Sequence, residues 1–208
     1  YGGPIGCVEV GLAGHQFGHT EAGNVNIPEC CNLVLFNGEK NGKLISIRTG
    51  DPTQLKTFEE FLAAVKAQIA HTIDICHIGL TVGEKIIAER FALPTFTMFC
   101  RDAVLRGKDV TQGGAYCNIG PSVQIMGLGT LIDSLAAIKK VVYEDKEATI
   151  ADIRAAIEAD FAGYEELRAK LRKAPKYGNN DDYADSIGID LWEFCADEVR
   201  SHKTYLGH

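Results

Sequence analysis

The sequence has no excess of positive charge, because 21 Lys and Arg residues stand against 28 Asp and Glu residues, for a formal net charge of −7. Nucleic-acid binding needs a basic face, so this balance argues against nucleic acid as the main partner. The sequence also lacks any apolar run near the roughly 18 residues that a membrane helix needs. Its start shows no signal peptide, which would combine a basic segment with an apolar one. We therefore expect no nucleic-acid or membrane partner and a cytoplasmic location.

Metal-binding cysteine patterns are absent as well. None of the seven cysteines has C-x-x-C spacing, which argues against a zinc ribbon or an iron–sulfur site. In a chain without a secretion signal, we expect free thiols, most of them small buried hydrophobic residues. We expect Cys30 and Cys31 to be buried core residues of this kind. Adjacent cysteines occur in radical chemistry, but these two follow Pro28 in an apolar run, where core packing explains them better.

The segment PKYGNNDDYAD, residues 175–185, concentrates turn-forming residues and acids. Its spacing does not fit an EF-hand loop, which needs Gly at the sixth position and Glu at the twelfth. We expect a structured loop in which Asn and Asp side chains bond to the backbone, and no metal site.

Hydrophobic residues make up 46% of the sequence, which is ordinary for a globular protein with a core. Apolar spacing predicts helices over residues 58–73, 81–93, 130–143, 149–173 and 185–200. In the last of these, Ile189, Trp192 and Val199 are expected to face inward. Thr57 with Glu60 has the pattern of a capping box, as does Thr149 with Asp152.

Extended segments are few. Residues 43–48 alternate like a strand, 95–100 have the composition of a buried strand, and 27–38 fit either a strand or a helix opened by Pro28. Short strands that alternate with helices indicate the α/β class. So few scattered strands do not complete a sheet, and we expect partner strands outside the chain, whose Tyr1-Gly2-Gly3 start also suggests a piece of something longer.

Gly6-Cys7-Val8-Glu9 is the first segment that can carry chemistry. In an extended backbone, residues two apart point to the same side, so Cys7 and Glu9 can face one small cavity. A buried cysteine beside a surface acid is the alternative. A second enzymatic alternative is a Cys–His hydrolase, in which His15 or His19 activates the thiol. Gly14 and Gly18 disfavour a helix there, and with it a metal site of two histidines.

Five segments in this order resemble the glycyl radical enzymes, the superfamily of pyruvate formate-lyase and its dehydratase and decarboxylase relatives. They are GCVE at 6–9, TGDP at 49–52 followed by TFEEF at 57–61, GGAY at 113–116, DSLAAIKK at 133–140 and PKYGNNDDYAD at 175–185. The resemblance implies an α/β fold that is part of a ten-stranded β/α barrel. Residues 1–208 are then one piece, the second portion of the catalytic barrel domain. The N-terminal half and the C-terminal glycyl radical domain lie outside it.

The resemblance also implies a radical mechanism. No cofactor is bound, and a glycyl radical outside this chain is installed by an activating enzyme that uses S-adenosylmethionine and an iron–sulfur cluster. Cys7 then carries the thiyl radical, and Glu9 handles a proton beside the substrate. His15, His19, Thr20 and Asn24 lie where relatives line the pocket, so they are candidate contacts for a small-molecule substrate. The expected partners are this activating enzyme, the rest of the polypeptide and a second copy in a homodimer.

Cys-x-Glu narrows the branch of the family. It is typical of members that eliminate water or a similar group, and arylacetate decarboxylases share it, whereas pyruvate formate-lyase has two adjacent cysteines in this loop and lacks the glutamate. Val10 departs from the proline that is common in dehydratases. We expect a lyase that acts anaerobically on a small polar metabolite. The alternatives are an arylacetate decarboxylase and, from another class, a structural fragment that is inert alone.

Overall fold

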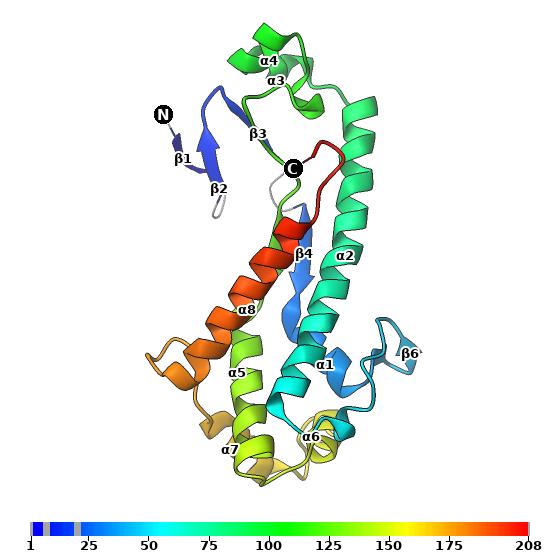
Figure 1. Cartoon of the computed structure of the whole chain (residues 1–208), viewed down its shortest axis with the longest axis vertical. Coiled ribbons are helices and arrows are strands. Elements are labelled where there is room, and N and C mark those ends of the chain that lie inside the picture. Colours follow the sequence, from blue (N-terminus) through cyan, green and yellow to red (C-terminus); the bar gives the residue numbers. More distant parts are fainter. Residues whose placement is uncertain (1, 6–8, 19–21, 208) are drawn as a thin grey trace. The chain divides into compact units, whose positions relative to one another are not determined.

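The computed structural model describes residues 2–5, 9–18 and 22–207. The chain forms two compact units: unit 1 comprises Tyr1–Val25, Asp74–Gln124 and Val199–His208, and unit 2 comprises Asn26–Ile73 and Ile125–Glu198. It passes from one unit to the other inside four elements (Figure 1), which are β4 (Gly23–Asn26), α2 (Phe58–Arg90), β8 (Val123–Met126) and α8 (Asp182–Ser201).

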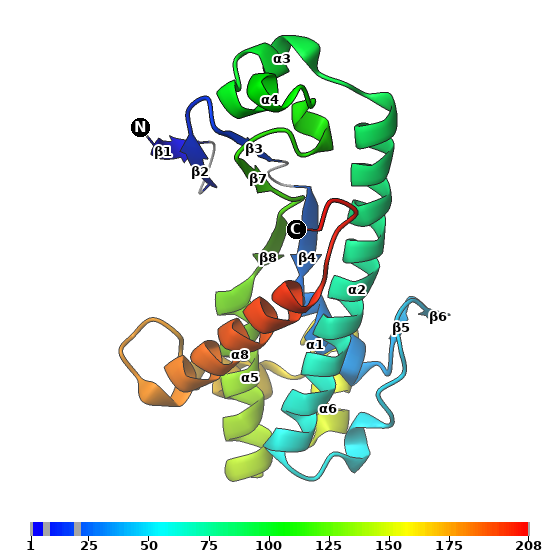
Figure 2. The same ribbon diagram turned by 45° about the horizontal axis from the view of Figure 1, so that its top comes forward.

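Unit 1 contains short strands and short helices. These are β1 (Gly2–Ile5), β2 (Glu9–Leu12), β3 (Gln16–Gly18), α3 (Pro94–Met98), α4 (Arg101–Arg106), the 3₁₀ turn η2 (Val110–Gln112) and β7 (Cys117–Ile119). β1 and β2 pair antiparallel, and β3 pairs in parallel with β7 (Figure 2). A small core of Cys100, Ala103, Val110 and Ala115 lies beneath them, with Phe17 packed against it.

Unit 2 is mainly helical. Its elements are α1 (Ile27–Leu35), β5 (Glu39–Lys40), β6 (Lys43–Leu44), the 3₁₀ turn η1 (Pro52–Gln54), α5 (Leu128–Ile138), the π-helical turn η3 (Lys139–Glu144), α6 (Ile150–Glu158) and α7 (Glu165–Lys173). Helix α5 packs against α1 and α7 and buries Leu131, Ile132 and Leu135 completely. Of the run at 27–38, residues Ile27–Leu35 are helical, with Pro28 in the first turn.

The strands confirm the α/β class. Those that the structure describes form pairs, β1–β2, β3–β7, β4–β8 and β5–β6, rather than one continuous sheet. Among the described helices, none combines the length and the apolarity that crossing a membrane requires. The six cysteines of the described residues are free thiols, as expected.

Helix α2 corrects the prediction of two separate helices. Its start is as predicted, because the Thr57 hydroxyl accepts the amide of Glu60 at 3.2 Å and the Glu60 carboxylate accepts the amide of Thr57 at 3.2 Å. The helix then continues for 33 residues without a break. The sequence predicts that a second helix begins at Thr81, but Thr81 lies inside the continuous helix, because threonine only lowers helix propensity.

Of the strands predicted over 43–48 and 95–100, the first is confirmed only in part and the second is wrong. Residues 95–100 fall largely in α3, which starts at Pro94, where the missing amide of proline is harmless. Phe96, Met98 and Phe99 are exposed, and only Cys100 enters the core. Of residues 43–48, Lys43 and Leu44 alone form a strand.

The predicted helix over 149–173 is interrupted. Its capping box is confirmed, because Thr149 and Asp152 exchange side chain to backbone hydrogen bonds. The chain leaves the helix after Glu158, and Asp160, Phe161 and Gly163 adopt positive φ angles that no α-helix contains. It resumes as α7.

Helix α8 confirms the last predicted helix but not its inward face. Ile189 and Trp192 are 62% and 58% exposed. The buried side is one residue out of phase and consists of Ala184, Ile187, Gly188, Leu191 and Cys195.

Candidate active site

The segment that contains Cys7 joins two paired strands. In the sequence, residues 6–8 follow β1 and precede β2, and Cys7 lies outside the described residues. The backbone of Glu9 begins β2 and pairs with Ile5. Glu9 is therefore in extended backbone, as the Cys-x-Glu interpretation requires, while its side chain lies outside what the structure describes.

Backbone hydrogen bonds fix the loop that follows β2. The amide of Arg101 donates to the carbonyl of Gly14 at 3.1 Å, and the amide of Cys117 donates to the carbonyl of His15 at 2.9 Å. Gly14 has a φ of +71°, which suits glycine and turns the chain toward these donors. The loop is thus held from two directions, by the start of α4 and by the start of β7 (Figure 2).

His15 is a candidate contact whose side chain the structure describes. Its Nδ1 lies 2.7 Å from Oδ2 of Asp102 in the first turn of α4. The His15 side chain is 46% exposed and that of Asp102 is 21% exposed. When the neutral ring donates from Nδ1 to this carboxylate, Nε2 becomes a hydrogen-bond acceptor, so the pair sets the tautomer of His15.

The partner Asp102 was missed from the sequence. It lies 87 positions from His15, and the predicted strand over 95–100 hid the start of α4. An acidic residue in the first turn of a helix is a recognisable sequence feature that could have drawn attention to Asp102, but only once the helix itself is predicted.

The GGAY segment is held rigidly beside this loop. An added Cβ at Gly114 would lie 2.0 Å from the carbonyl oxygen of Lys108, so no other residue fits there. The carbonyl of Ala115 accepts hydrogen bonds from Arg106 at 2.9 Å and from Asn118 at 2.8 Å. Tyr116 is left 71% exposed immediately before Cys117, the residue that bonds to the His15 carbonyl.

Asp109 organises the backbone that leads to GGAY. Its carboxylate accepts hydrogen bonds from the amides of Leu93 and Thr111 and from the hydroxyls of Thr97 and Thr111, at 2.7 to 3.2 Å. Burial acts to raise the pKa of Asp109, but these hydrogen bonds outweigh it and hold the pKa below its usual value. The ionised carboxylate therefore ties α3 to η2.

The described part of the structure does not show the other candidate contacts beside His15. Asn24 is exposed on β4. His19 and Thr20 lie outside the described residues, so their predicted role as substrate contacts stays a prediction.

The cysteine pair at 30 and 31 and the segment 175–185 have the structural roles that the sequence predicts. Cys30 and Cys31 are 1% and 4% exposed in the core of unit 2, and burial raises the pKa of the Cys31 thiol to about 12. In the 175–185 segment, carboxylates of Asp185 and Asp181 accept the amides of Gly178 and Tyr183, each at 3.0 Å. These are the side chain to backbone bonds of a structured loop.

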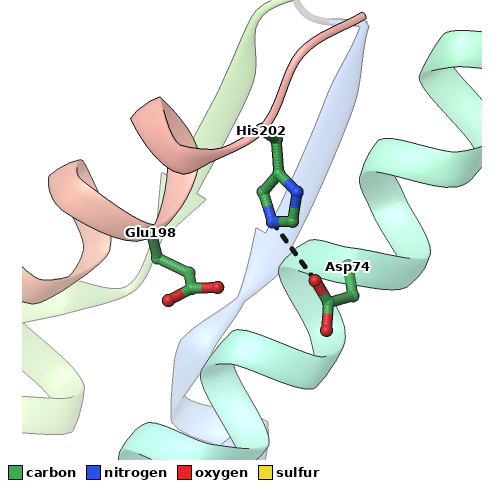
Figure 3. A group of neighbouring side chains, drawn as sticks. All are labelled: Asp74, Glu198 and His202. Atoms are coloured by element: carbon green, nitrogen blue, oxygen red, sulfur yellow. Dashed lines mark ion pairs between the residues drawn. The ribbon is translucent and has the colours of Figure 1, made fainter.

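A second histidine–carboxylate pair holds the C-terminal segment in unit 1. Nε2 of His202 lies 3.2 Å from Oδ1 of Asp74 (Figure 3), and the ring of His77 stacks on that of His202 at 4.5 Å. Glu198, also drawn in Figure 3, belongs to unit 2. We interpret the His202–Asp74 pair as an anchor for the C-terminal segment.

Comparison with known proteins matches the whole chain. The model of the pyruvate formate lyase-like family matches residues 1–208. The chain is 38% identical over 209 residues to trans-4-hydroxy-L-proline dehydratase of Clostridioides difficile, covering 99% of this chain and 26% of that protein. It is 36% identical over 196 residues to isethionate sulfite-lyase of Desulfovibrio desulfuricans, covering 89% of this chain and 23% of that protein.

A solved structure shows the same fold. The crystal structure of hydroxyproline dehydratase from Clostridioides difficile, with trans-4-hydroxy-L-proline bound, superposes with a TM-score of 0.93 at 38% identity. The match covers 99% of this chain and 26% of that one. The chain therefore spans about a quarter of the length of the relatives it matches.

The Asp109 network generates a pH-dependent prediction. Because its folded pKa is lowered, Asp109 contributes stability that is present above its unfolded pKa of about 4 and is lost as the pH falls through the folded value. Asp109→Asn should therefore lower the free energy of unfolding by about 1–3 kcal/mol at pH 7, and the loss should shrink on acidification. Urea unfolding from pH 7 to pH 3 measures this.

The control is Glu89→Gln, which changes an exposed carboxylate at the end of α2, 4.0 Å from Lys85. It should alter stability by less than about 0.5 kcal/mol. An Asp109→Asn loss that stayed constant at every pH would contradict the role given to the ionised carboxylate.

Proposed function

The chain belongs to the pyruvate formate lyase-like family, and from this premise we propose that it is part of a glycyl radical lyase. The enzyme uses a thiyl radical to abstract hydrogen from a small polar metabolite and eliminates water or a similar leaving group. The observation that carries the proposal is 38% identity over 99% of the chain with a dehydratase, together with the Cys7-x-Glu9 pattern. The relatives are named as a dehydratase and a sulfite-lyase, so elimination is the chemistry they share.

The proposed enzyme needs more polypeptide than this chain. Because the chain spans 26% of its dehydratase relative, we place it in one portion of a ten-stranded β/α barrel whose other strands complete the described pairs. In this proposal residues 1–208 belong to the catalytic barrel domain, and the radical glycine lies in another part of the polypeptide. The piece is inactive alone, and the complete enzyme is a homodimer in the cytoplasm, where thiols stay reduced.

A glycyl radical outside this chain, installed by an activating enzyme with S-adenosylmethionine and an iron–sulfur cluster, supplies the one-electron chemistry. In the proposed reaction, the Cys7 thiol gives up a hydrogen atom and becomes a thiyl radical. Cys7 then takes one hydrogen atom from a substrate carbon, which re-forms the S–H bond and leaves the radical on the substrate. After elimination, Cys7 returns the hydrogen atom to the product radical and becomes a thiyl radical again, so the sulfur leaves the substrate step in the state in which it entered.

Glu9 moves the proton in this scheme. The leaving hydroxyl of the substrate departs as water only when it gains a proton. The neighbouring substrate group loses a proton: a hydroxyl does so as it becomes a carbonyl, and an amine does so as it becomes an imine. The carboxyl group of Glu9, two residues from Cys7 in the sequence, can accept the proton that the neighbouring group loses and deliver a proton to the leaving hydroxyl.

His15 positions the substrate in this proposal. Asp102 accepts a hydrogen bond from Nδ1, so Nε2 of His15 can accept one from a substrate hydroxyl or ammonium group. His19, Thr20 and Asn24 are the further proposed contacts, since they follow on the same segment. Polar side chains of this kind suit a polar metabolite.

The role of Cys7 is tested in the full-length protein after anaerobic activation. Cys7→Ser should leave the glycyl radical signal in the electron paramagnetic resonance spectrum intact and abolish turnover, because an O–H bond is too strong to exchange hydrogen atoms with substrate carbon. Cys30→Ser, at a buried core cysteine, is the matched control and should retain turnover per folded protein. Turnover by the Cys7→Ser protein would disprove the proposed role.

The role of Glu9 is tested by Glu9→Gln. The amide keeps the shape of the carboxylate but cannot accept the proton, so kcat should fall by roughly 10²–10⁴-fold while the radical signal persists. Glu89→Gln serves as the control for a carboxylate remote in sequence. An unchanged rate in Glu9→Gln would exclude Glu9 from proton transfer.

A further inference from the structure

The part of α2 that belongs to unit 1 carries an exposed apolar stripe. Ile75, Ile78, Val82 and Ile86 are 55%, 63%, 53% and 47% exposed. Their spacing of three, four and four residues places them on one face of the helix. Folded proteins rarely leave such a contiguous apolar row in water, so this face has the character of a packing surface.

Two glycines lie within this stripe. Gly79 and Gly83 are one helical turn apart, and a Cβ added at either would meet no described atom within 4 Å. Glycine disfavours a helix interior, so two of them at this spacing have a packing explanation: they let a second backbone approach the helix closely. A hollow of about 390 Å³ runs beside them, with Ile75, Cys76 and Pro121 also in its lining.

The C-terminal segment of unit 1 leads to this part of α2. Beyond the His202–Asp74 anchor, the amide of Leu206 donates to the carboxylate of Glu84 at 2.9 Å. Nζ of Lys85 lies 5.9 Å from the centre of the Tyr205 ring. The segment therefore follows α2 to the turn that contains Gly83, and Figures 1 and 2 both show it beside the helix.

We propose that the polypeptide segment following His208 packs on the stripe of Ile75, Ile78, Val82 and Ile86 and crosses α2 at Gly79 and Gly83. This rests on the proposed function, which makes the chain part of a longer polypeptide. The structural relative is longer than this chain, since 99% of this chain matches 26% of that one, so the proposed enzyme has further polypeptide that can cover this face.

Tethering favours this occupant over a second copy of the chain. Leu206 is held at Glu84, which lies on the opposite side of α2 from the stripe. The residues that come next need only pass around this one helix to reach the stripe, so they have a high effective concentration there. A second copy would first lose its translational freedom. A membrane surface is not favoured either, because glycines that accommodate a close backbone have no function against lipid tails.

Site-specific labelling of the full-length protein tests whether the stripe is covered. Ile78→Cys and Val82→Cys reduce side-chain size on the stripe, and Glu59→Cys places the same thiol at an exposed position in the first turn of the same helix, away from the stripe. Maleimide labelling is followed by peptide mass spectrometry, which separates these sites from the native cysteines. We expect at least tenfold slower labelling at 78 and 82 than at 59 in the native protein, and equal rates in denaturant. Equal native rates would overturn the proposal.

Cross-linking identifies the occupant. A photoreactive amino acid at Ile86, at the end of the stripe, should form cross-links within one chain to peptides that follow His208. Cross-links that join two chains, cross-links confined to segments before Tyr1, or no cross-link to the following segment would each overturn the proposal. Both experiments are done in air without activation, so their failure leaves the radical chemistry untested rather than disproved.

Discussion

The backbone bonds that hold residues 14 and 15 are the constraint on which the candidate site depends. The amides of Arg101 and Cys117 come from two places far along the chain, and both donate to this one loop. A loop fixed by a single bond could still rotate about it, whereas two bonds from different elements define its orientation. Glu9 begins β2, and β2 leads directly into this loop.

The scaffold that supplies these amides is itself held by polar interactions rather than by a large core. The four core residues beneath it are small, and the Asp109 carboxylate ties α3 to η2 through hydrogen bonds. Arg106 and Asn118 then fix the GGAY turn that precedes Cys117. Directional bonds of this kind specify geometry better than apolar packing does, which suits a part of the molecule that must present side chains accurately.

Local signals made much of the fold predictable. The capping boxes at Thr57 and Thr149 and the buried cysteine pair involve residues that are close in sequence, so their physics is contained in a short window. The same is true of the 175–185 loop, whose Asx-type bonds span seven residues or fewer. For residues 27–38 the sequence left a strand and a helix open, and the structure has the helix.

The errors came from tertiary context. The aromatic and β-branched residues of 95–100 favour a strand, but Pro94 and the Asp109 bonds to Leu93 and Thr97 stabilise a helical turn instead. The sequence predicted separate helices over 58–73 and 81–93, where a single helix in fact continues. The His15–Asp102 pair joins positions 87 apart, and only the folded chain brings them together.

The most direct test of this account is a double-mutant cycle on His15 and Asp102 in the activated full-length enzyme. His15→Gln and Asp102→Asn should each lower kcat/KM by about tenfold, and the double variant should be no worse than either single one, because both disrupt the same interaction. Single variants with unchanged kcat/KM, or effects that multiply in the double variant, would show that this loop does not position the substrate through the pair.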